Sequence, residues 1–547
     1  MSIVVTLCTP QIKPGAVKSN TQSILACIAK AKKSDVVVFP RLCITGATCS
    51  GMFSYPLLTN AAGAALEQIA AAGGNKTVII GLPTVKDGKV FDSIAIIKNG
   101  TTAIYSPKKG MTDIAASPLC YGEDIIPDLD EGGLKVRVLS DIDEKEAIGA
   151  DLVIIPTAYP TYIGGLEDVF SRAKMLRSVA IVSAGKGESV SGKIMSGDKI
   201  VCTLGKIEEY AGFDEESVTA KLGVPKNKPL PPKSPMREVS LLPQSDDECA
   251  QMYELMGRGV LGRMREIGTD KVILGLSGGL DSTNVLVALT MAFDKYKLDK
   301  KNIICVTMRG GASSKRTQDN SAALIDGYKV TSYNIPIDAA VTLHMRSIAH
   351  EQKDVVYENA QARERTQILL DLSNKFNALM VGTGDLSEIC LGFSTFGGDQ
   401  LSQYNPNCSI TKTAMRKMLK YYTTTKHAKP VSKIIEDILS TPISPELLSG
   451  QETEEILGPY NIHDFYITEI VAKKLAPKDV MEDAINQFAI TPQAAEKYMK
   501  TLLNRLFKFQ FKRNFGPDGV QMFPYDLTDL IVRSDFSPEL WLDNCGL

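Results

Sequence analysis

The segment ILGLSGGLDST, from Ile273 to Thr283, has the residue types that bind phosphate. It lies between an apolar run and the helical pattern TNVLVALTMAF. Glycines let the backbone approach an anion closely, and the free N–H groups at a helix start point toward it along a favourable dipole. The segment therefore predicts a phosphate site made by Gly275, Ser277, Gly278, Gly279 and Ser282.

Asp281 indicates a metal beside that phosphate. The segment lacks the GK[ST] ending that supplies a lysine to a transferring γ-phosphate, which disfavours ordinary kinase or NTPase chemistry. A carboxylate next to pyrophosphate suits Mg²⁺, which prefers oxygen ligands. The alternative is a plain strand-to-helix turn with a capping aspartate.

Apolar runs that become helical patterns must position this turn. KVILGLSGG, NIICVTM and ALMVGTGD read as strands followed by helices, which predicts a doubly wound parallel sheet with its site at the carboxyl ends of the strands. The earlier runs SDVVVFP, KTVIIGLP and ADLVIIPT predict another α/β layered domain. GVPKNKPLPPKSP is typical of a linker, so we expect domains at 1–222 and 246–547 joined by 223–245.

Composition limits the class of protein. Of 547 residues, 44% are hydrophobic and 23% charged, and no apolar run has the roughly 18 residues of a membrane span. A formal net charge of -2 gives no reason to expect nucleic acid as the main partner. Eleven scattered cysteines and four histidines disfavour a zinc site or a disulfide framework. The N-terminus reads as a strand without signal-peptide features, so we expect a cytoplasmic protein.

Several motifs carry a family resemblance. SGGLDS resembles the loop of the N-type ATP pyrophosphatases, which cleave ATP between its α and β phosphates. Residues 357–413, from YENAQAR through GTGDLSE to TKT, closely resemble the core of the glutamine-dependent NAD synthetases, as do SPELLSGQETEEILGPYNIHDFYI and FQFKRNFGPDG. The resemblance implies an adenine nucleotide α-hydrolase-like synthetase domain that follows a nitrilase-like αββα domain.

The resemblance also implies a reaction. The carboxylate of deamido-NAD attacks the α-phosphate of ATP, giving an adenylate and pyrophosphate, and ammonia then displaces AMP to leave NAD. Asp281 and Glu388 would hold Mg²⁺, and Thr383 and Lys412 would contact ATP. Asp281, Glu388 and Lys412 are the expected catalytic groups. The residues expected at deamido-NAD are Asn359, Arg363, Glu388, Asp399 and Lys512.

Each of these residues also has an ordinary structural interpretation. Arg363 and Arg365 could be solvated helix residues, and Glu388 could be a helix residue after the capping region of Asp385 and Ser387. The phenylalanines around Lys512 and Arg513 fit a core or an interface better than a stacking platform for nucleic acid. Their joint occurrence favours the enzyme.

Residues 1–222 resemble the glutaminase domain that supplies ammonia in this family, but two of its three catalytic groups differ. The family uses a glutamate base, a lysine and a cysteine nucleophile. Here the base position is Arg41, the lysine corresponds to Lys108, and the nucleophile position is Ser140. Cys120 in LCYGEDI imitates the missing motif but follows Lys108 by only twelve positions.

We therefore expect a glutaminase domain without activity, and a synthase that uses free ammonia or a separate ammonia source. We also expect a homo-oligomer, as the family implies. Three alternatives remain: a glutamine-dependent NAD synthase, another amide-forming ATP pyrophosphatase such as GMP synthetase, and an inactive homologue kept for binding or assembly.

Overall fold

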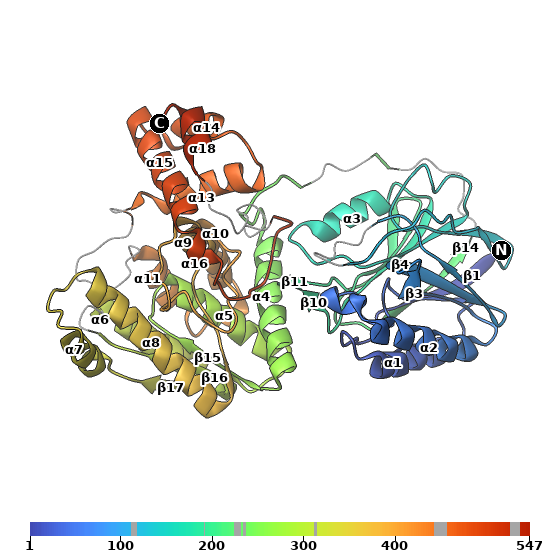
Figure 1. Cartoon of the computed structure of the whole chain (residues 1–547), viewed down its shortest axis with the longest axis horizontal. Helices are drawn as coiled ribbons and strands as arrows, with labels where there is room; N and C mark the ends of the chain where they lie inside the picture. Colours follow the sequence, from blue (N-terminus) through green and yellow to red (C-terminus); the bar gives the residue numbers. More distant parts are fainter. Residues whose placement is uncertain are drawn as a thin grey trace. The chain divides into compact units, whose positions relative to one another are not determined.

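The computed structural model describes residues 1–110, 118–190, 192–223, 231–232, 237–310, 314–441, 454, 457–525 and 537–547 (Figure 1). Most of the predicted linker segment GVPKNKPLPPKSP, and the first part of SPELLSGQETEEILGPYNIHDFYI, lie outside these residues. The chain divides into two compact units, Met1–Arg237 (unit 1) and Glu238–Leu547 (unit 2).

Unit 1 alternates strands with a few helices. Its elements are β1 (Ser2–Cys8), α1 (Val17–Lys30), β2 (Val36–Val38), η1 (Ser50–Ser54), α2 (Pro56–Gly73), β3 (Thr77–Lys86), β4 (Lys89–Lys98), β5 (Thr101–Tyr105), β6 (Leu129–Glu131), β7 (Leu134–Val138), β8 (Leu152–Thr157), α3 (Gly165–Ala173), β9 (Ser178–Ser183), β10 (Ser189–Val190), β11 (Lys193–Ile194), β12 (Lys199–Thr203), β13 (Lys206–Ala211) and β14 (Ser217–Gly223).

Twelve strands of unit 1 form two mixed sheets packed face to face, and β10 and β11 pair separately as an antiparallel ribbon. One sheet has the order β14-β1-β2-β3-β4-β5 and the other β13-β12-β9-β8-β7-β6. Side chains alternate between the faces of each strand, so Val5 and Ile154 meet in one core between the sheets. The opposite faces form separate cores, one under α1 and α2 and one under α3. The layers are therefore αββα, as the family resemblance implies.

Unit 2 begins with a long helix and a parallel sheet and continues as helices. Its elements are α4 (Asp246–Ile267), β15 (Lys271–Gly275), α5 (Leu280–Lys295), η2 (Lys300–Asn302), β16 (Ile303–Thr307), α6 (Lys315–Tyr328), β17 (Thr331–Asn334), α7 (Asp338–Ser347), α8 (Val355–Phe376), β18 (Ala378–Met380), α9 (Leu386–Leu391), α10 (Lys412–Thr423), η3 (Lys426–Ala428), α11 (Ser432–Ser440), α13 (Tyr460–Tyr466), η4 (Ile467–Ala472), α14 (Pro477–Phe488), α15 (Pro492–Lys508), α16 (Gln510–Arg513) and α18 (Glu539–Cys545).

The sheet of unit 2 has the order β17-β16-β15-β18, and every pair is parallel. Helix α8 packs its apolar side on one face, where Leu369 meets Ile273 and Met380. The chain runs outward from β15 through β16 to β17 and then returns to β18 on the other side. Ligands of doubly wound sheets bind at such a reversal, outside the carboxyl ends of the strands. Here the reversal brings the glycine turn after β15 beside the segment after β18.

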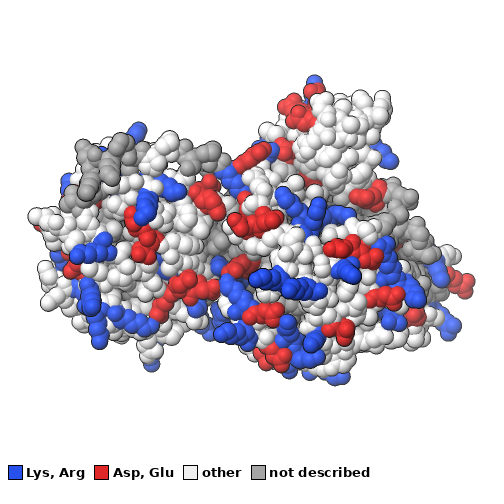
Figure 2. Space-filling model, turned by 180° about the vertical axis from the view of Figure 1, so that it is seen from behind, with Lys and Arg blue, Asp and Glu red and all other residues white. Residues whose placement is uncertain are grey.

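On the face drawn in Figure 2, Lys and Arg side chains are interspersed with Asp and Glu side chains. Within the described part of the chain, helices that combine the length and the apolarity of a membrane span do not occur.

Candidate active site

The glycine turn joins β15 to α5 and has the geometry that the sequence predicts. The Ser277 hydroxyl accepts the Gly279 N–H at 3.1 Å and lies 3.1 Å from the Ser282 hydroxyl. Gly278 has φ 86°, and a Cβ there would lie 2.1 Å from the Thr317 carbonyl oxygen. Only glycine fits such a position, because both the backbone angle and the neighbouring backbone exclude a side chain.

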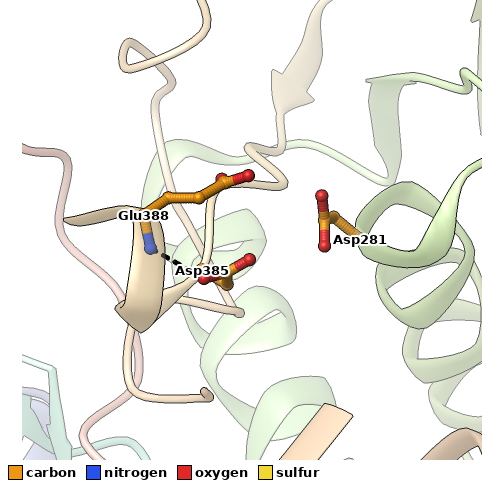
Figure 3. Close-up of side chains that lie close together, drawn as sticks. All are labelled: Asp281, Asp385 and Glu388. Atoms are coloured by element: carbon orange, nitrogen blue, oxygen red, sulfur yellow. Dashed lines mark hydrogen bonds between the residues drawn. The ribbon is translucent and has the colours of Figure 1, made fainter. Parts of the chain in front are cut away.

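Three carboxylates meet beside this turn: Asp281, Asp385 and Glu388 (Figure 3). Asp281 lies in the first turn of α5, whereas Asp385 and Glu388 belong to the segment after β18. One oxygen from each carboxylate lies within 4.8 Å of the others. Asp385 is the N-cap of α9 and accepts the Glu388 N–H at 3.0 Å, which fixes Glu388 relative to Asp385.

Lys412 brings its side-chain amine to all three carboxylates. Its Nζ lies 2.6 Å from Asp281 Oδ1, 2.7 Å from Asp385 Oδ2 and 3.0 Å from Glu388 Oε1. The ring of Tyr460 lies on another side, with its centroid 5.6 Å from Nζ. Nothing in the sequence predicted this pairing, since Lys412 was expected to contact ATP phosphate.

Burial and charge shift the pKa values of Asp385, Glu388 and Lys412. Burial, helped by repulsion from the neighbouring carboxylates, raises the pKa of Glu388 and raises that of Asp385 to about 7, although Lys412 opposes both shifts. Burial acts against the charge of Lys412, but the three carboxylates outweigh it and raise the pKa of Lys412. The amine therefore stays protonated, and it stabilises carboxylates that would otherwise repel one another.

Buried hydrogen bonds hold the start of α10, where Lys412 lies, against the start of α9. The Ser387 hydroxyl accepts the backbone N–H of Lys412 at 2.9 Å and donates to Asp464 at 2.5 Å. Asp464 also accepts the N–H and hydroxyl of Thr413. The Asn407 amide donates to the carbonyls of Thr383 and Asp281, which joins the turn to the segment after β18.

Four of the five residues predicted to bind deamido-NAD form a second cluster, whereas the fifth, Glu388, belongs to the carboxylate cluster. The Asn359 side-chain oxygen accepts the Thr395 hydroxyl at 2.8 Å, and the Asp399 carboxylate accepts the Thr395 N–H at 2.6 Å. Arg363 Nε donates to the Phe396 carbonyl at 3.2 Å. These contacts gather side chains of α8 around the loop after α9.

Lys512 in α16 reaches the same loop. Its Nζ donates to the carbonyls of Gly392 and Ser394, at 2.8 and 2.6 Å, and lies 4.7 Å from the centroid of the Phe509 ring. Burial, together with the nearby charge of Arg505, lowers the pKa of Lys512. The predicted site residues of unit 2 thus fall into two groups, linked by α9.

Sequence reasoning missed two members of the site. It treated Asp385 only as a capping residue, which it is, and did not expect its second oxygen to pair with Lys412. Asn407 was not singled out at all, although an asparagine in the run QYNPNCS that is fully buried must find partners. The position of Asp385 directly after an apolar strand, at the predicted site edge, could have indicated it.

The carboxylate cluster has the donor set that suits Mg²⁺. Its ligands are carboxylate oxygens, and Asp281 and Glu388 are partly exposed, so a hydrated ion carrying phosphate oxygens can reach them. The residues therefore fit the predicted ion.

In unit 1, Arg41 is fully buried and pairs with Asp92 of β4. Their Nε and Oδ2 atoms are 3.0 Å apart, and both side chains are completely shielded from solvent. Burial raises the pKa of Asp92, against the opposing effect of Arg41. A buried arginine paired in this way is a structural cation and cannot accept a proton.

The other two positions of the predicted glutaminase site lie near each other in the backbone. Ser140 follows β7 and is buried, and a Cβ on Gly110 would lie 1.7 Å from the Ser140 carbonyl oxygen. Lys108 is half-exposed and forms an ion pair with Glu146. The backbone of Cys120 forms an isolated β-bridge with Phe91 of β4, and the Cys120 carbonyl accepts the Asp92 N–H at 3.1 Å.

Comparison with known proteins identifies unit 2. Residues 253–515 match the family model described as NAD synthase, a range that includes the glycine turn, the carboxylate cluster and Lys512. This part of the chain is an NAD synthase domain. The glutamine-dependent NAD(+) synthetase of Mycobacterium leprae is 25% identical over 98% of this chain and 97% of its own length. That of Aquifex aeolicus is 26% identical over 92% of this chain and 94% of its own length.

The likeness extends to the fold of the whole chain. The glutamine-dependent NAD(+) synthetase from Cytophaga hutchinsonii has a TM-score of 0.81 and 18% identity, and the match covers 100% of both chains. The predicted resemblance to glutamine-dependent NAD synthetases is thereby confirmed, and so is the predicted order of an αββα unit followed by an NAD synthase domain. An NAD synthase domain makes the chain a ligase.

Proposed function

We propose that this chain makes NAD by ATP-dependent amidation of deamido-NAD, through an adenylate, and that its nitrogen comes from free ammonia. The observation that carries the synthase part is the meeting of the glycine turn with Asp281, Asp385, Glu388 and Lys412 at the switch point of the parallel sheet. This arrangement suits a reaction that releases pyrophosphate beside a divalent cation.

In this proposal the glycine turn and the carboxylate cluster bind different parts of the ATP–Mg²⁺ complex. The free N–H groups of the 275–282 turn, with the hydroxyls of Ser277 and Ser282, bind the leaving pyrophosphate at the start of α5. Thr383 and Lys412 contact ATP from the segments after β18 and at the start of α10. Asp281 and Glu388 hold Mg²⁺, which when bound offsets the charge that collects on the phosphate oxygens.

The second cluster orients deamido-NAD. Asn359 and Arg363 contact the loop 392–399 from α8, and Lys512 contacts it from α16. Asp399 lies within this loop and accepts the Thr395 N–H. Arginine and lysine here balance the negative charges of a dinucleotide. Because α9 joins this loop to Glu388, the nicotinate carboxylate can be held near the α-phosphate of ATP for attack.

The proposal on nitrogen rests on unit 1. Hydrolysis of a glutamine amide by a nitrilase-like site needs a base that accepts a proton from the nucleophile. The buried pair of Arg41 and Asp92 supplies no such base from position 41, and a serine at position 140 is a weak nucleophile without one. Free ammonia, or ammonia from a separate protein, therefore replaces the glutaminase product.

The test is NAD formation from deamido-NAD, ATP and Mg²⁺ with either ammonium or glutamine as the sole nitrogen source. We expect activity with ammonium and none with glutamine. Glutamine-driven activity lost in Cys120→Ala or Ser140→Ala would refute the nitrogen proposal and leave a glutamine-dependent synthase. Inactivity with both sources would refute the synthase proposal and favour a homologue kept for binding or assembly.

A further inference from the structure

The amine of Lys412 occupies the position of a cation among the carboxylates of the proposed metal site. It lies within 3.0 Å of one oxygen from each of Asp281, Asp385 and Glu388. Mg²⁺ held by Asp281 and Glu388 would need the oxygens that this amine now contacts. The lysine and the metal therefore compete for the same pair of carboxylates.

The cluster has a buried inner side and a partly exposed outer side. The side chains of Lys412 and Asp385 are 1% and 0% exposed, whereas those of Asp281 and Glu388 are 27% and 21% exposed. An ion that arrives from solvent thus meets Asp281 and Glu388 first. Asp385 lies on the inner side, so its pairing with Lys412 can persist while the outer two contacts are exchanged.

The backbone around Lys412 is fixed, which leaves its side chain as the part that can move. Its N–H is held by Ser387, and Thr413, the next residue, is held twice by Asp464. The ring of Tyr460 closes another side of the amine. A lysine side chain has four rotatable bonds, so a shift of its amine by a few ångströms needs no movement of α10.

We propose that Lys412 is an internal substitute cation and Asp385 its permanent counter-ion. Before the metal binds, Lys412 holds Asp281 and Glu388 in place; when the metal binds, it gives up those two oxygens and stays paired with Asp385, with its amine directed toward the phosphate. Asp385 is then a positioning residue that acts through Lys412. This inference rests on the proposed function, since it assumes that Asp281 and Glu388 hold the metal.

The test measures Mn²⁺ binding to the full chain without ATP, from the loss of the free Mn²⁺ signal in electron paramagnetic resonance. The charge-matched pair Lys412→Met with Asp385→Asn removes the competing cation and its counter-ion together, so the net charge of the cluster does not change. We expect this double variant to bind Mn²⁺ at least about tenfold more tightly than the original chain. Lys412→Gln alone should change binding in the same direction.

Asp385→Asn alone should weaken Mn²⁺ binding, because Lys412 then pairs only with the two metal ligands and the cluster loses one negative charge. Equal binding by the original chain and the double variant, or weaker binding by the double variant, would overturn the inference. Asp281→Asn with Glu388→Gln, added to the double variant, should abolish the tight site. If Mn²⁺ binding persists there, it is the proposed metal site itself that fails, and the inference with it.

Discussion

The buried pair of Arg41 and Asp92 in unit 1 permits a quantitative prediction. At 3.0 Å and with no solvent at either side chain, replacing Arg41 by Met leaves Asp92 as an uncompensated buried charge. Coulomb attraction at this distance is about 5 to 6 kcal/mol with an effective dielectric of about 20. Breaking a buried pair typically costs about 3 to 5 kcal/mol. We expect Arg41→Met to destabilise unit 1 by about that amount.

The combined change Arg41→Met with Asp92→Leu should recover most of this loss, because neither charge then remains and the apolar side chains fill the space. Hydrogen exchange of peptides from β4, read by mass spectrometry on the full chain, measures the local free energy of opening in each variant. Asp92 has a raised pKa in the folded state, so in Arg41→Met the destabilisation should grow as the pH rises through that pKa and shrink toward pH 4.

If Arg41→Met lowers the stability of unit 1 by less than about 1 kcal/mol, the interpretation of Arg41 and Asp92 as a buried structural ion pair is refuted. A double variant as unstable as the single one would refute it as well. NAD formation with ammonium should be retained in the double variant, because neither residue belongs to the synthase domain. If Arg41→Met instead removed a glutamine-driven activity of the original chain, Arg41 would have a role in chemistry that its burial does not suggest.

Three further predictions concern single side chains. Gly278→Ala should raise the KM for ATP at least about tenfold, because the new Cβ would lie 2.1 Å from the Thr317 carbonyl oxygen. Gly279→Ala is the milder control, since its Cβ would meet only the Ser277 hydroxyl, at 3.3 Å. Equal effects of the two substitutions would contradict this prediction. Lys512→Met should raise the KM for deamido-NAD about 10- to 100-fold more than kcat falls, and the exposed Lys508→Met should not. Burial raises the pKa of Glu188 to about 7, so the stability of unit 1 should fall by up to about 3 kcal/mol as the pH rises from 5 to 8. In Glu188→Gln, the stability of unit 1 measured by thermal melting should no longer fall with pH over that range. If it still falls, Glu188 is not the source of the pH dependence.

Local patterns were enough to predict the fold class and the phosphate turn. The short continuous apolar runs and the glycine turn before an apolar helix are short-range signals, and β15, β16, β18 and α5 lie where they indicate. Strand β17, with the sequence TSYN, was not predicted, because an exposed edge strand lacks an apolar run.

Side-chain pairings between distant segments could not be predicted from the sequence. Lys412 and Asp385 are recognisable as candidates, but only the folded chain brings them together across the loop between α9 and α10. Asp92 in KVFDSIAIIK is a lone carboxylate in an apolar strand, and buried carboxylates need partners. That signal was present and was not used, and it would have suggested a structural arginine at position 41.

The short helix α9 serves both clusters of the NAD synthase domain. Its first turn carries Glu388, and the loop that follows Gly392 supplies the carbonyls held by Lys512 and Arg363. Under the proposed function, a displacement of this one element would therefore disturb the binding of ATP and of deamido-NAD at the same time. Substitutions on either side of α9 should combine with energetic effects that are not additive, which places an evolutionary constraint on pairs of positions rather than on single ones.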